Sequence, residues 1–297
     1  MSNPINTVSE EYILHIVSAA IREDAPEGDI TSEILIPAGL KGSARMVVKQ
    51  DGVIAGTAVA RAVFKYVDDR TDAAVMIDDG AAVKKGDLIM QMTGYMRSIL
   101  KAERSALNFI QRMSGIASTA ALYVDKVSGT GVDIADTRKT TPGLRLLEKY
   151  AVAMGGGRNH RLNLSDAVLI KDNHFDSLKI AGINYRQAVA KARKEAPENI
   201  IVEAEARSIN DAVEAAEAGA DIVMLDNMSL EDMRNAVRLM KGKVEIEASG
   251  GITLENVRDI AETGVDFISV GALTHSYNSL DISLEIKPQP LNEDYGL

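Results

Sequence analysis

Hydrophobic positions in the first third of the chain follow two different periods. Over 8–21 they recur every three or four residues, which predicts an amphipathic helix. Over 42–94 they form short runs separated by glycine-containing turns, which is typical of strands. We expect 44–49 and 51–56 to be strands on either side of a turn, with a helix near 58–66. The pattern therefore predicts a small sheet accompanied by one helix.

A long amphipathic helix is predicted over 97–118. Its apolar residues keep to one stripe, while Arg104 and Asn108 lie on another face. We expect the helix to bury one side and to present polar groups on the other.

From residue 131 onward, strand and helix patterns alternate. An apolar run followed by a helical period occurs three times in succession, at steps of roughly 20 to 25 residues. Ser208, Ser229 and Thr253 are expected to cap these helices, and Gly219 and Gly264 to end two of them. Repeating βα units predict a parallel sheet, and the short repeat with polar strand ends favours a barrel.

This change of pattern predicts an α/β protein with two domains. We expect an N-terminal domain over 1–114 and an α/β barrel domain over 115–277. The tail, 278–297, contains prolines and no clear period, and we expect it to pack on the N-terminal domain.

Composition excludes several classes of function. The 297 residues carry 33 Lys and Arg against 43 Asp and Glu, a net charge of −10, which disfavours a nucleic-acid-binding protein. The chain has no cysteine, which excludes disulfides, thiolate zinc sites and a cysteine nucleophile. The N-terminus lacks a signal-peptide pattern, and no apolar run approaches the roughly 20 residues that cross a membrane. We therefore expect a cytoplasmic protein.

Positive charge is concentrated between the first two strands of the predicted barrel. The segment 136–174 has an excess of +3 within a chain of net charge −10. Such a concentration at strand ends is typical of a site for a small polyanion, because Lys and Arg pair with carboxylate and phosphate groups. Solvated loops with charges of both signs are the alternative. The Lys and Arg residues are Arg138, Lys139, Arg145, Lys149, Arg158, Arg161 and Lys171.

Two glycine-containing turns follow consecutive strands. Ser249, Gly250 and Gly251 come after one strand, and Gly271 and Ala272 come after the next. Backbone N–H groups in such turns bind phosphate in barrel enzymes. Tight turns without a ligand are the alternative.

Two carboxylates end adjacent strands of the predicted barrel. Glu203 and Asp226 could share Mg²⁺ with a bound pyrophosphate, although salt bridges with nearby lysines are the alternative. Glu205 lies two residues beyond Glu203 and points to the same face of its strand.

Eight short strings, in order along the chain, resemble one family closely. Those most specific for it are DTRKTTPG at 136–143, GGGRNHR at 155–161 and LIKDNH at 169–174. The chain resembles quinolinate phosphoribosyltransferase, also called nicotinate-nucleotide pyrophosphorylase (carboxylating). The other strings lie at 23–31, 103–111, 224–227, 247–251 and 269–276.

The resemblance implies a pentosyl-transferring enzyme, a glycosyltransferase of pyridine nucleotide and NAD biosynthesis. Members join quinolinate to phosphoribosyl pyrophosphate (PRPP) and yield nicotinate mononucleotide, pyrophosphate and CO₂, with Mg²⁺ as cofactor. The implied fold is an open α/β barrel with an N-terminal α/β sandwich, and 79–94 has the pattern of a hammerhead turn. The implied assembly is a head-to-tail homodimer, or a larger oligomer built from it.

The resemblance also implies a role for each candidate residue. Glu203 and Asp226 would bind the ribose hydroxyls and Mg²⁺, and Lys139, Lys171 and His174 would contact phosphate or pyrophosphate. Arg104 would reach the site of the neighbouring subunit. The quinolinate carboxylates would be held by Arg104, Arg138, His160, Arg161 and Lys171. The 5′-phosphate would be held by Ser249, Gly250, Gly251, Gly271 and Ala272.

The expected chemistry suits these residue types. Displacement at the ribose anomeric carbon passes through an oxocarbenium-like state, which a nearby carboxylate stabilises. Glu203 is our candidate for that role, and Lys139, Lys171 and Asp226 complete the predicted catalytic set. Because the quaternised ring nitrogen acts as an electron sink, we expect that CO₂ loss needs no essential general acid.

Other readings remain open at this stage. A molybdenum-associated paralogue of the family shares the glycine-containing strings, but the 171–174 string favours the transferase. Nicotinate phosphoribosyltransferase acts on a monocarboxylate, which needs fewer cations than this chain offers. A non-catalytic binding protein would not need carboxylates at Glu203 and Asp226. Asn163 stands where the family commonly has glycine.

Overall fold

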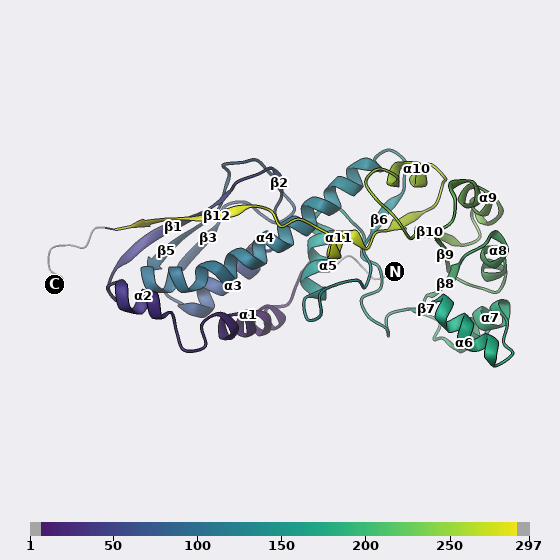
Figure 1. Cartoon of the computed structure of the whole chain (residues 1–297), viewed down its shortest axis with the longest axis horizontal. Helices are drawn as coiled ribbons and strands as arrows, with labels where there is room; N and C mark the ends of the chain where they lie inside the picture. The colour runs from purple at the N-terminus through teal and green to yellow at the C-terminus, as the bar shows by residue number, and fades with distance from the viewer. Residues whose placement is uncertain (1–6, 290–297) are drawn as a thin grey trace. The chain divides into compact units, whose positions relative to one another are not determined.

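The computed structural model describes residues 7–289, which form two compact units (Figure 1). One unit comprises 7–119 together with 277–289, and the other comprises 120–276. Residues 1–6 and 290–297, which belong to the predicted N-terminal domain and tail, lie outside the described residues.

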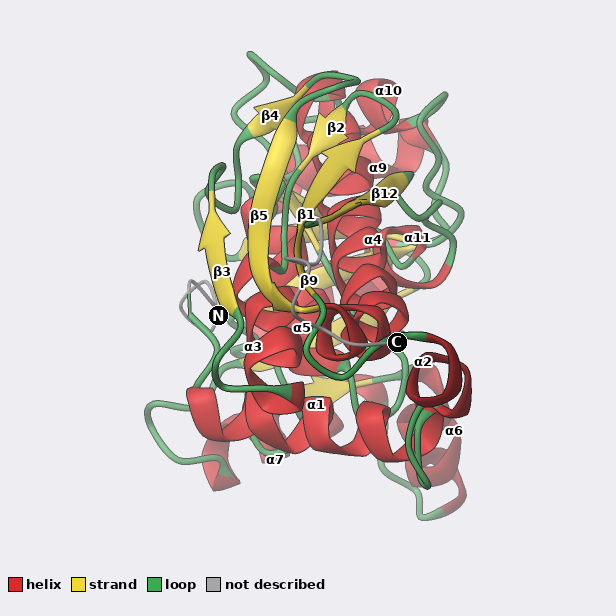
Figure 2. Cartoon of the chain, turned by 90° about the vertical axis from the view of Figure 1, so that its left-hand side faces the viewer, coloured by secondary structure: helices red, strands yellow, loops and turns green. Residues whose placement is uncertain are grey.

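The N-terminal unit is built on a four-stranded antiparallel sheet in the order β12-β1-β5-β3. Figure 2 shows β1 and β5 as long curved strands side by side. The tail contributes β12, which pairs with β1 along its whole length from Gly42 to Val48. The strands span Lys41–Val48 (β1), Asp72–Val75 (β3), Leu88–Tyr95 (β5) and Ile282–Pro288 (β12).

The two strands expected on either side of a turn are both present, but the second is short and they do not pair with each other. A short β2 (Gly52–Val53) pairs instead with β4 (Ala82–Val83). Backbone N–H groups of this segment donate to helix serines: Val53 N to Ser118 Oγ at 2.8 Å, and Ala55 N to Ser114 Oγ at 3.0 Å. The chain leaves β1 because these side chains satisfy the backbone groups that a hairpin would pair.

Within residues 7–289, four helices, α1 to α4, accompany this sheet. The longest, α4, contains Arg104 and extends eight residues beyond the predicted end at 118. It ends at Lys126 because the backbone turns at Gly129 and Gly131, both with positive φ. The helices span Glu10–Asp24 (α1), Ile30–Leu35 (α2), Thr57–Val67 (α3) and Met96–Lys126 (α4).

The second unit contains a six-stranded parallel sheet in the order β6-β11-β10-β9-β8-β7. Its edge strands β6 and β7 do not pair with each other, so the barrel is open between them. This confirms the predicted fold class. The strands span Asp133–Ala135 (β6), Val168–Ile170 (β7), Val202–Ala206 (β8), Ile222–Asp226 (β9), Glu245–Ser249 (β10) and Phe267–Ser269 (β11).

Helices α8 and α9 lie along the outer side of the curved sheet (Figure 1). As predicted, the side chains of Ser208 and Ser229 cap them. Thr253 does not cap α10, because Asn256 is the N-cap and accepts a hydrogen bond from the Thr253 N–H. The helices span Arg145–Met154 (α5), Asp172–Ile180 (α6), Tyr185–Glu195 (α7), Ile209–Glu217 (α8), Leu230–Met240 (α9), Val257–Ala261 (α10) and Ala272–His275 (α11). None of the described helices is long and apolar enough to cross a membrane.

Candidate active site

A cavity of about 740 Å³ opens at the carboxyl ends of the parallel strands. Each of the six strands, or the turn that follows it, contributes to the lining. This is the position of ligand sites in α/β barrels, because all carboxyl ends of a parallel sheet meet at one edge. The lining includes Thr137, Arg138, Lys139, His160, Arg161, Lys171, Asp172, Asn173, Glu205, Asp226, Asn227, Glu247, Ser249, Gly250, Gly251, Ser269, Gly271, Ala272 and His275.

Four of the seven predicted cations line this cavity. One side of the Arg161 guanidinium is held by the fold, since its Nη1 donates to the Ala167 carbonyl at 3.0 Å. Burial and the neighbouring charge of Arg138 lower the pKa of the Arg161 guanidinium. An anion bound between the two arginines would relieve that repulsion. The four are Arg138, Lys139, Arg161 and Lys171.

The other three cations serve the fold. Lys149 is fully buried, forms an ion pair with Asp136 and donates to the His160 carbonyl at 2.9 Å. Arg158 reaches Glu245 at 2.8 Å, away from the cavity lining. Arg145 donates to Thr140 Oγ1 and to the Leu162 carbonyl. The charge excess seen in the sequence therefore divides between ligand binding and internal pairing.

Two carboxylates from adjacent strands line the cavity, Glu205 on β8 and Asp226 on β9. Burial raises the pKa of Glu205, and the negative charge of Asp226 raises it further. Lys171 Nζ stands 4.0 Å from Glu205 Oε2 and partly offsets this. Two crowded carboxylates at the edge of a cavity are suited to a hard divalent cation.

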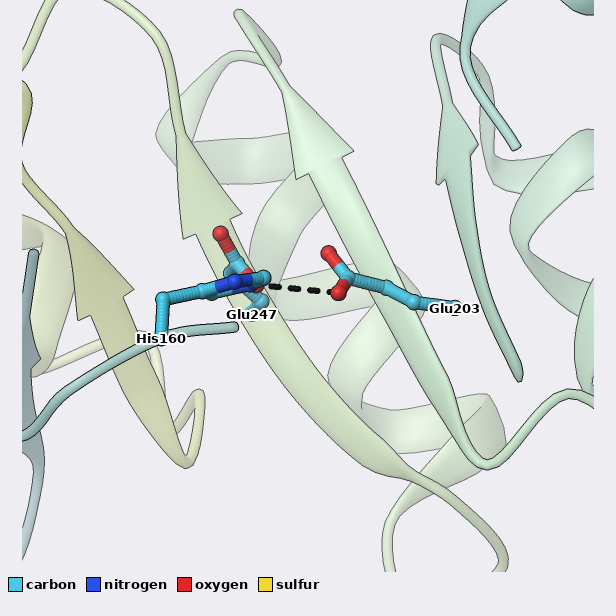
Figure 3. Close-up of side chains that lie close together, drawn as sticks. All are labelled: His160, Glu203 and Glu247. Atoms are coloured by element: carbon cyan, nitrogen blue, oxygen red, sulfur yellow. Dashed lines mark hydrogen bonds and ion pairs between the residues drawn. The ribbon is translucent and has the colours of Figure 1, made fainter. Parts of the chain in front are cut away.

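Glu203 lies behind the cavity wall, where it meets His160 and Glu247 (Figure 3). His160 Nε2 is 3.1 Å from Glu203 Oε2 and 3.2 Å from Glu247 Oε2. All three residues are buried. The structure therefore places Glu203 in a buried polar cluster, whereas Glu205 takes the cavity-lining position that the sequence assigned to Glu203.

The protonation of this cluster follows from its hydrogen bonds. Burial lowers the pKa of the His160 imidazole, whereas its bonds to Glu203 and Glu247 raise it. The Arg161 N–H, however, donates to Nδ1 at 2.8 Å and leaves no room there for a second proton. We therefore assign the neutral ring with its proton on Nε2.

A metal ion does not suit this cluster, although its three ligand atoms lie within 4.8 Å of one another. The proton on Nε2 occupies the lone pair that a metal would need. Burial and the charge of Glu203 raise the pKa of Glu247 to about 8, which keeps that carboxyl protonated at neutral pH. The cluster is best described as a shared-proton network beneath the cavity.

Glycine is required where the turns meet the cavity. Gly250 has φ 90° and Gly251 has φ 60°, in the left-handed region. A Cβ on Gly271 would lie 2.9 Å from Lys139 Cδ, so a larger residue would displace that lysine. The turns thus bring backbone N–H groups close to any anion in the cavity.

Buried polar atoms without a protein partner gather around the same place. Among the described residues, Arg138 Nε, Glu247 Oε1 and Ser269 Oγ are such atoms, and all three residues line the cavity. Glu203 Oε1 is a fourth, directly beneath it. Buried polar groups are rarely left unpaired, so this concentration marks a place where ligand or water completes the structure.

The comparisons with known proteins agree with this geometry. The family description "Quinolinate phosphoribosyl transferase, C-terminal domain" matches residues 116–285, and the corresponding N-terminal domain matches 29–114. The chain belongs to the quinolinate phosphoribosyltransferase family. Its activity is accordingly that of a nicotinate-nucleotide pyrophosphorylase (carboxylating) in NAD biosynthesis.

Relatives of this family match nearly the whole chain. A probable nicotinate-nucleotide pyrophosphorylase (carboxylating) of Bacillus subtilis is 40% identical over 264 residues, 89% of this chain and 90% of the relative. A chloroplastic enzyme of the same name from Arabidopsis thaliana is 42% identical over 91% of this chain and 82% of its own length. The solved structure of nicotinate-nucleotide pyrophosphorylase from Francisella tularensis superposes with a TM-score of 0.91, at 39% identity, over 97% of this chain and all of that one.

Eleven of the fourteen residues predicted for this family's site line the cavity. The other three are Arg104, which lies exposed on α4 in the other unit, Glu203, and His174. His174 accepts the Lys171 N–H through Nδ1 at 2.9 Å and so holds the start of α6. His160 lines the cavity, but the Arg161 N–H, Glu203 and Glu247 engage its ring nitrogens, so it supports the wall.

The cavity residues that were not assigned roles from the sequence include Glu205, Asn227, Glu247 and His275. For Glu205 the signal was present, since it lies nearer the carboxyl end of its strand than Glu203 does. Glu247 precedes the Ser-Gly-Gly turn by two residues, so strand alternation places its side chain on the same face as Ser249. Asn227 and His275 lie within the family strings at 224–227 and 269–276, but no role was assigned to either.

Proposed function

We propose that the cavity binds quinolinate and PRPP at the same time, with quinolinate at one end and PRPP at the other. The arrangement that supports this best is one cavity in which arginines and lysines face two carboxylates and two glycine turns. Arg138, Arg161 and Lys171 hold the two quinolinate carboxylates. Arginine forms two parallel hydrogen bonds with a carboxylate, which also fixes the plane of the ring.

PRPP occupies the opposite side of the cavity in this proposal. Ser249, Gly250, Gly251, Gly271 and Ala272 bind its 5′-phosphate through backbone N–H groups. Lys139 and Lys171 neutralise the pyrophosphate, and His174 holds the Lys171 backbone at the start of α6. The large negative charge of PRPP explains why this part of an acidic chain is basic.

Mg²⁺ fits the carboxylate pair. The sequence paired Asp226 with Glu203, but we propose Asp226 with Glu205, because both line the cavity and because burial, together with the charge of Asp226, raises the pKa of Glu205. Bound there with the pyrophosphate of PRPP, the cation would neutralise the charge of the leaving group. Asp226 and Glu205 also accept hydrogen bonds from the ribose hydroxyls.

The chain's residues then favour displacement at the anomeric carbon. As the bond to pyrophosphate breaks, positive charge develops on the ribose ring, and the carboxylates of Asp226 and Glu205 stabilise it. Lys139 and Lys171 stabilise the departing oxygens. Loss of CO₂ follows from the quaternised ring without an essential general acid, and the electron pair left on the ring carbon takes a proton.

We propose a head-to-tail homodimer as the working assembly. Arg104 is exposed and belongs to the unit that does not contain the cavity. In the dimer it reaches the partner's cavity and adds a further cation for quinolinate. We also propose that the enzyme works in the cytoplasm, as the sequence predicts.

Product analysis tests the function. Purified protein is incubated with Mg²⁺, PRPP and carboxyl-labelled quinolinate, and in parallel with nicotinate. We expect nicotinate mononucleotide and labelled CO₂ from quinolinate alone. Lys171→Ala is expected to lower kcat/KM for quinolinate by roughly 10- to 100-fold, the size of a lost charged hydrogen bond. Turnover of nicotinate, or of neither substrate by a folded protein, would overturn the proposal.

A further inference from the structure

Asn227 holds an unusual backbone conformation at the edge of the cavity. Its φ is 52°, and among the described residues it is the only non-glycine residue with positive φ. It directly follows Asp226 at the end of β9 and lines the cavity. Such conformations are unfavourable for most side chains and persist where surrounding contacts impose them.

The contacts of Asn227 join two parts of the site. Its backbone N–H donates to the Ser249 carbonyl at 3.0 Å, which links the end of β9 to the end of β10. Its Nδ2 donates to Asp226 Oδ2 at 2.9 Å. Its amide also packs on the glycine turn, since a Cβ on Gly250 would lie 2.4 Å from Asn227 Cγ. One side chain therefore touches both the carboxylate and the turn.

We propose that Asn227 is a positioning residue for PRPP, which sets the Asp226 carboxylate and the Gly250 turn at a fixed separation. The inference rests on the proposed function, in which Asp226 serves the magnesium-bound pyrophosphate and ribose while Gly250 serves the 5′-phosphate. A rigid spacing lets one PRPP molecule contact the carboxylate and the turn at the same time. Neither group then has to lose conformational freedom when PRPP binds.

The chemistry of asparagine fits this role better than that of related side chains. Asparagine tolerates positive φ more readily than most residues, and its amide can donate to a carboxylate. Aspartate in its place would put a second negative charge against Asp226. Glycine would adopt the backbone conformation but has no side-chain amide. Alanine would be strained at positive φ and also lacks the amide.

These differences define the test. PRPP dissociation constants are measured by calorimetry with and without Mg²⁺, together with KM for each substrate, kcat and Tm. Asn227→Gly is expected to weaken PRPP binding in Mg²⁺ roughly tenfold, the size of a hydrogen bond to a charged group. Its KM for quinolinate should stay within about twofold and its Tm should not fall, because glycine suits positive φ. Asn227→Asp should weaken PRPP binding further through repulsion.

Asn210→Ala, an exposed asparagine on α8, is the matched control and should behave as wild type. Wild-type PRPP affinity in Asn227→Gly would overturn the inference. So would an equal loss for both substrates accompanied by a lower Tm, which would indicate a purely structural role. If Asn227→Gly does not fold, Asn227→Asp in the same assay decides. Failure of the wild-type chain to bind PRPP would instead reject the proposed function.

Discussion

At the scale of single residues, similar side chains have very different roles because their surroundings differ. Lys149 and Lys171 lie in the same basic stretch, yet Lys149 is fully buried against Asp136 whereas Lys171 lines the cavity. A buried lysine without its partner would leave a charge in a nonpolar interior, so Lys149 is held by that pairing. Charge counted along the sequence cannot separate these two uses.

The shared-proton network of His160, Glu203 and Glu247 predicts a pH-dependent stability. Glu247 loses its proton near its ordinary pKa of 4.5 when unfolded, but near 8 in the folded chain, because burial and then the charge of Glu203 raise the pKa. Between these values the folded state keeps a proton that the unfolded state has lost, so stability falls as pH rises. Glu247→Gln does not titrate at this position. We expect its Tm to change less than that of the wild type between pH 5 and 8.

Thermal unfolding followed by circular dichroism at half-unit pH steps checks this. Glu245→Gln, at a less buried residue on the same strand, is the control; it loses a bond to Arg158, so its pH dependence and not its absolute Tm is compared. Parallel Tm curves for wild type and Glu247→Gln would contradict the assignment of the extra proton to this network.

At the scale of elements, position along a strand decides function. Glu203 and Glu205 share the inner face of β8, but two residues correspond to roughly 6 to 7 Å along the strand. That distance separates the buried cluster from the cavity lining. The same logic applies to β10, where Glu247 lies deeper than Ser249.

A pair of substitutions on β8 tests this reading. Glu205→Gln is expected to raise KM for PRPP roughly tenfold and to increase the Mg²⁺ concentration needed for half-maximal activity, because one anionic ligand is lost. Glu203→Gln should change Tm while leaving KM for PRPP within about twofold. Steady-state kinetics over a Mg²⁺ series makes the comparison. If Glu203→Gln rather than Glu205→Gln raised KM for PRPP and the Mg²⁺ requirement, Glu203 would be the magnesium ligand, as the sequence suggested.

At the scale of the whole molecule, the residues predicted to bind substrate are distributed over both units. The cavity and its lining lie within 120–276, whereas Arg104 lies in the unit formed by 7–119 and 277–289. In the proposed head-to-tail dimer, Arg104 of one chain completes the quinolinate site of the other, so activity would require the dimer. This is a property of the assembly that neither unit has alone.

Subunit complementation tests the shared site. Arg104→Ala and Lys171→Ala are each expected to lose most activity, because each removes a cation from the quinolinate site. Mixed and allowed to exchange subunits, they form heterodimers in which one site carries both substitutions and the other carries neither. We expect activity to return to about a quarter of wild type for random pairing in a dimer. No recovery, with exchange demonstrated by a labelled subunit, would place Arg104 outside the partner's site.

Much of this fold could be predicted because local signals agree with it. The βα repeat, the caps at Ser208 and Ser229 and the glycines at 219 and 264 all depend on short-range contacts. The strand ends likewise identified most of the cavity lining, since parallel strands carry their carboxyl ends to one edge. The strand expected over 51–56 is shorter than predicted because serines from α4, distant in sequence, take its backbone groups.

The sequence by itself determined the family, the barrel and the kinds of groups that meet at the carboxyl ends of its strands. It could do so because periodicity, turn residues and motif order are local properties. Only the tertiary structure decided which of those groups face the cavity. It placed Glu205 at the wall and Glu203 beneath it, engaged the ring nitrogens of His160, and packed Asn227 on Gly250. Burial and hydrogen-bond partners come from segments far apart in the chain, and these decide what an ionisable or polar side chain can do.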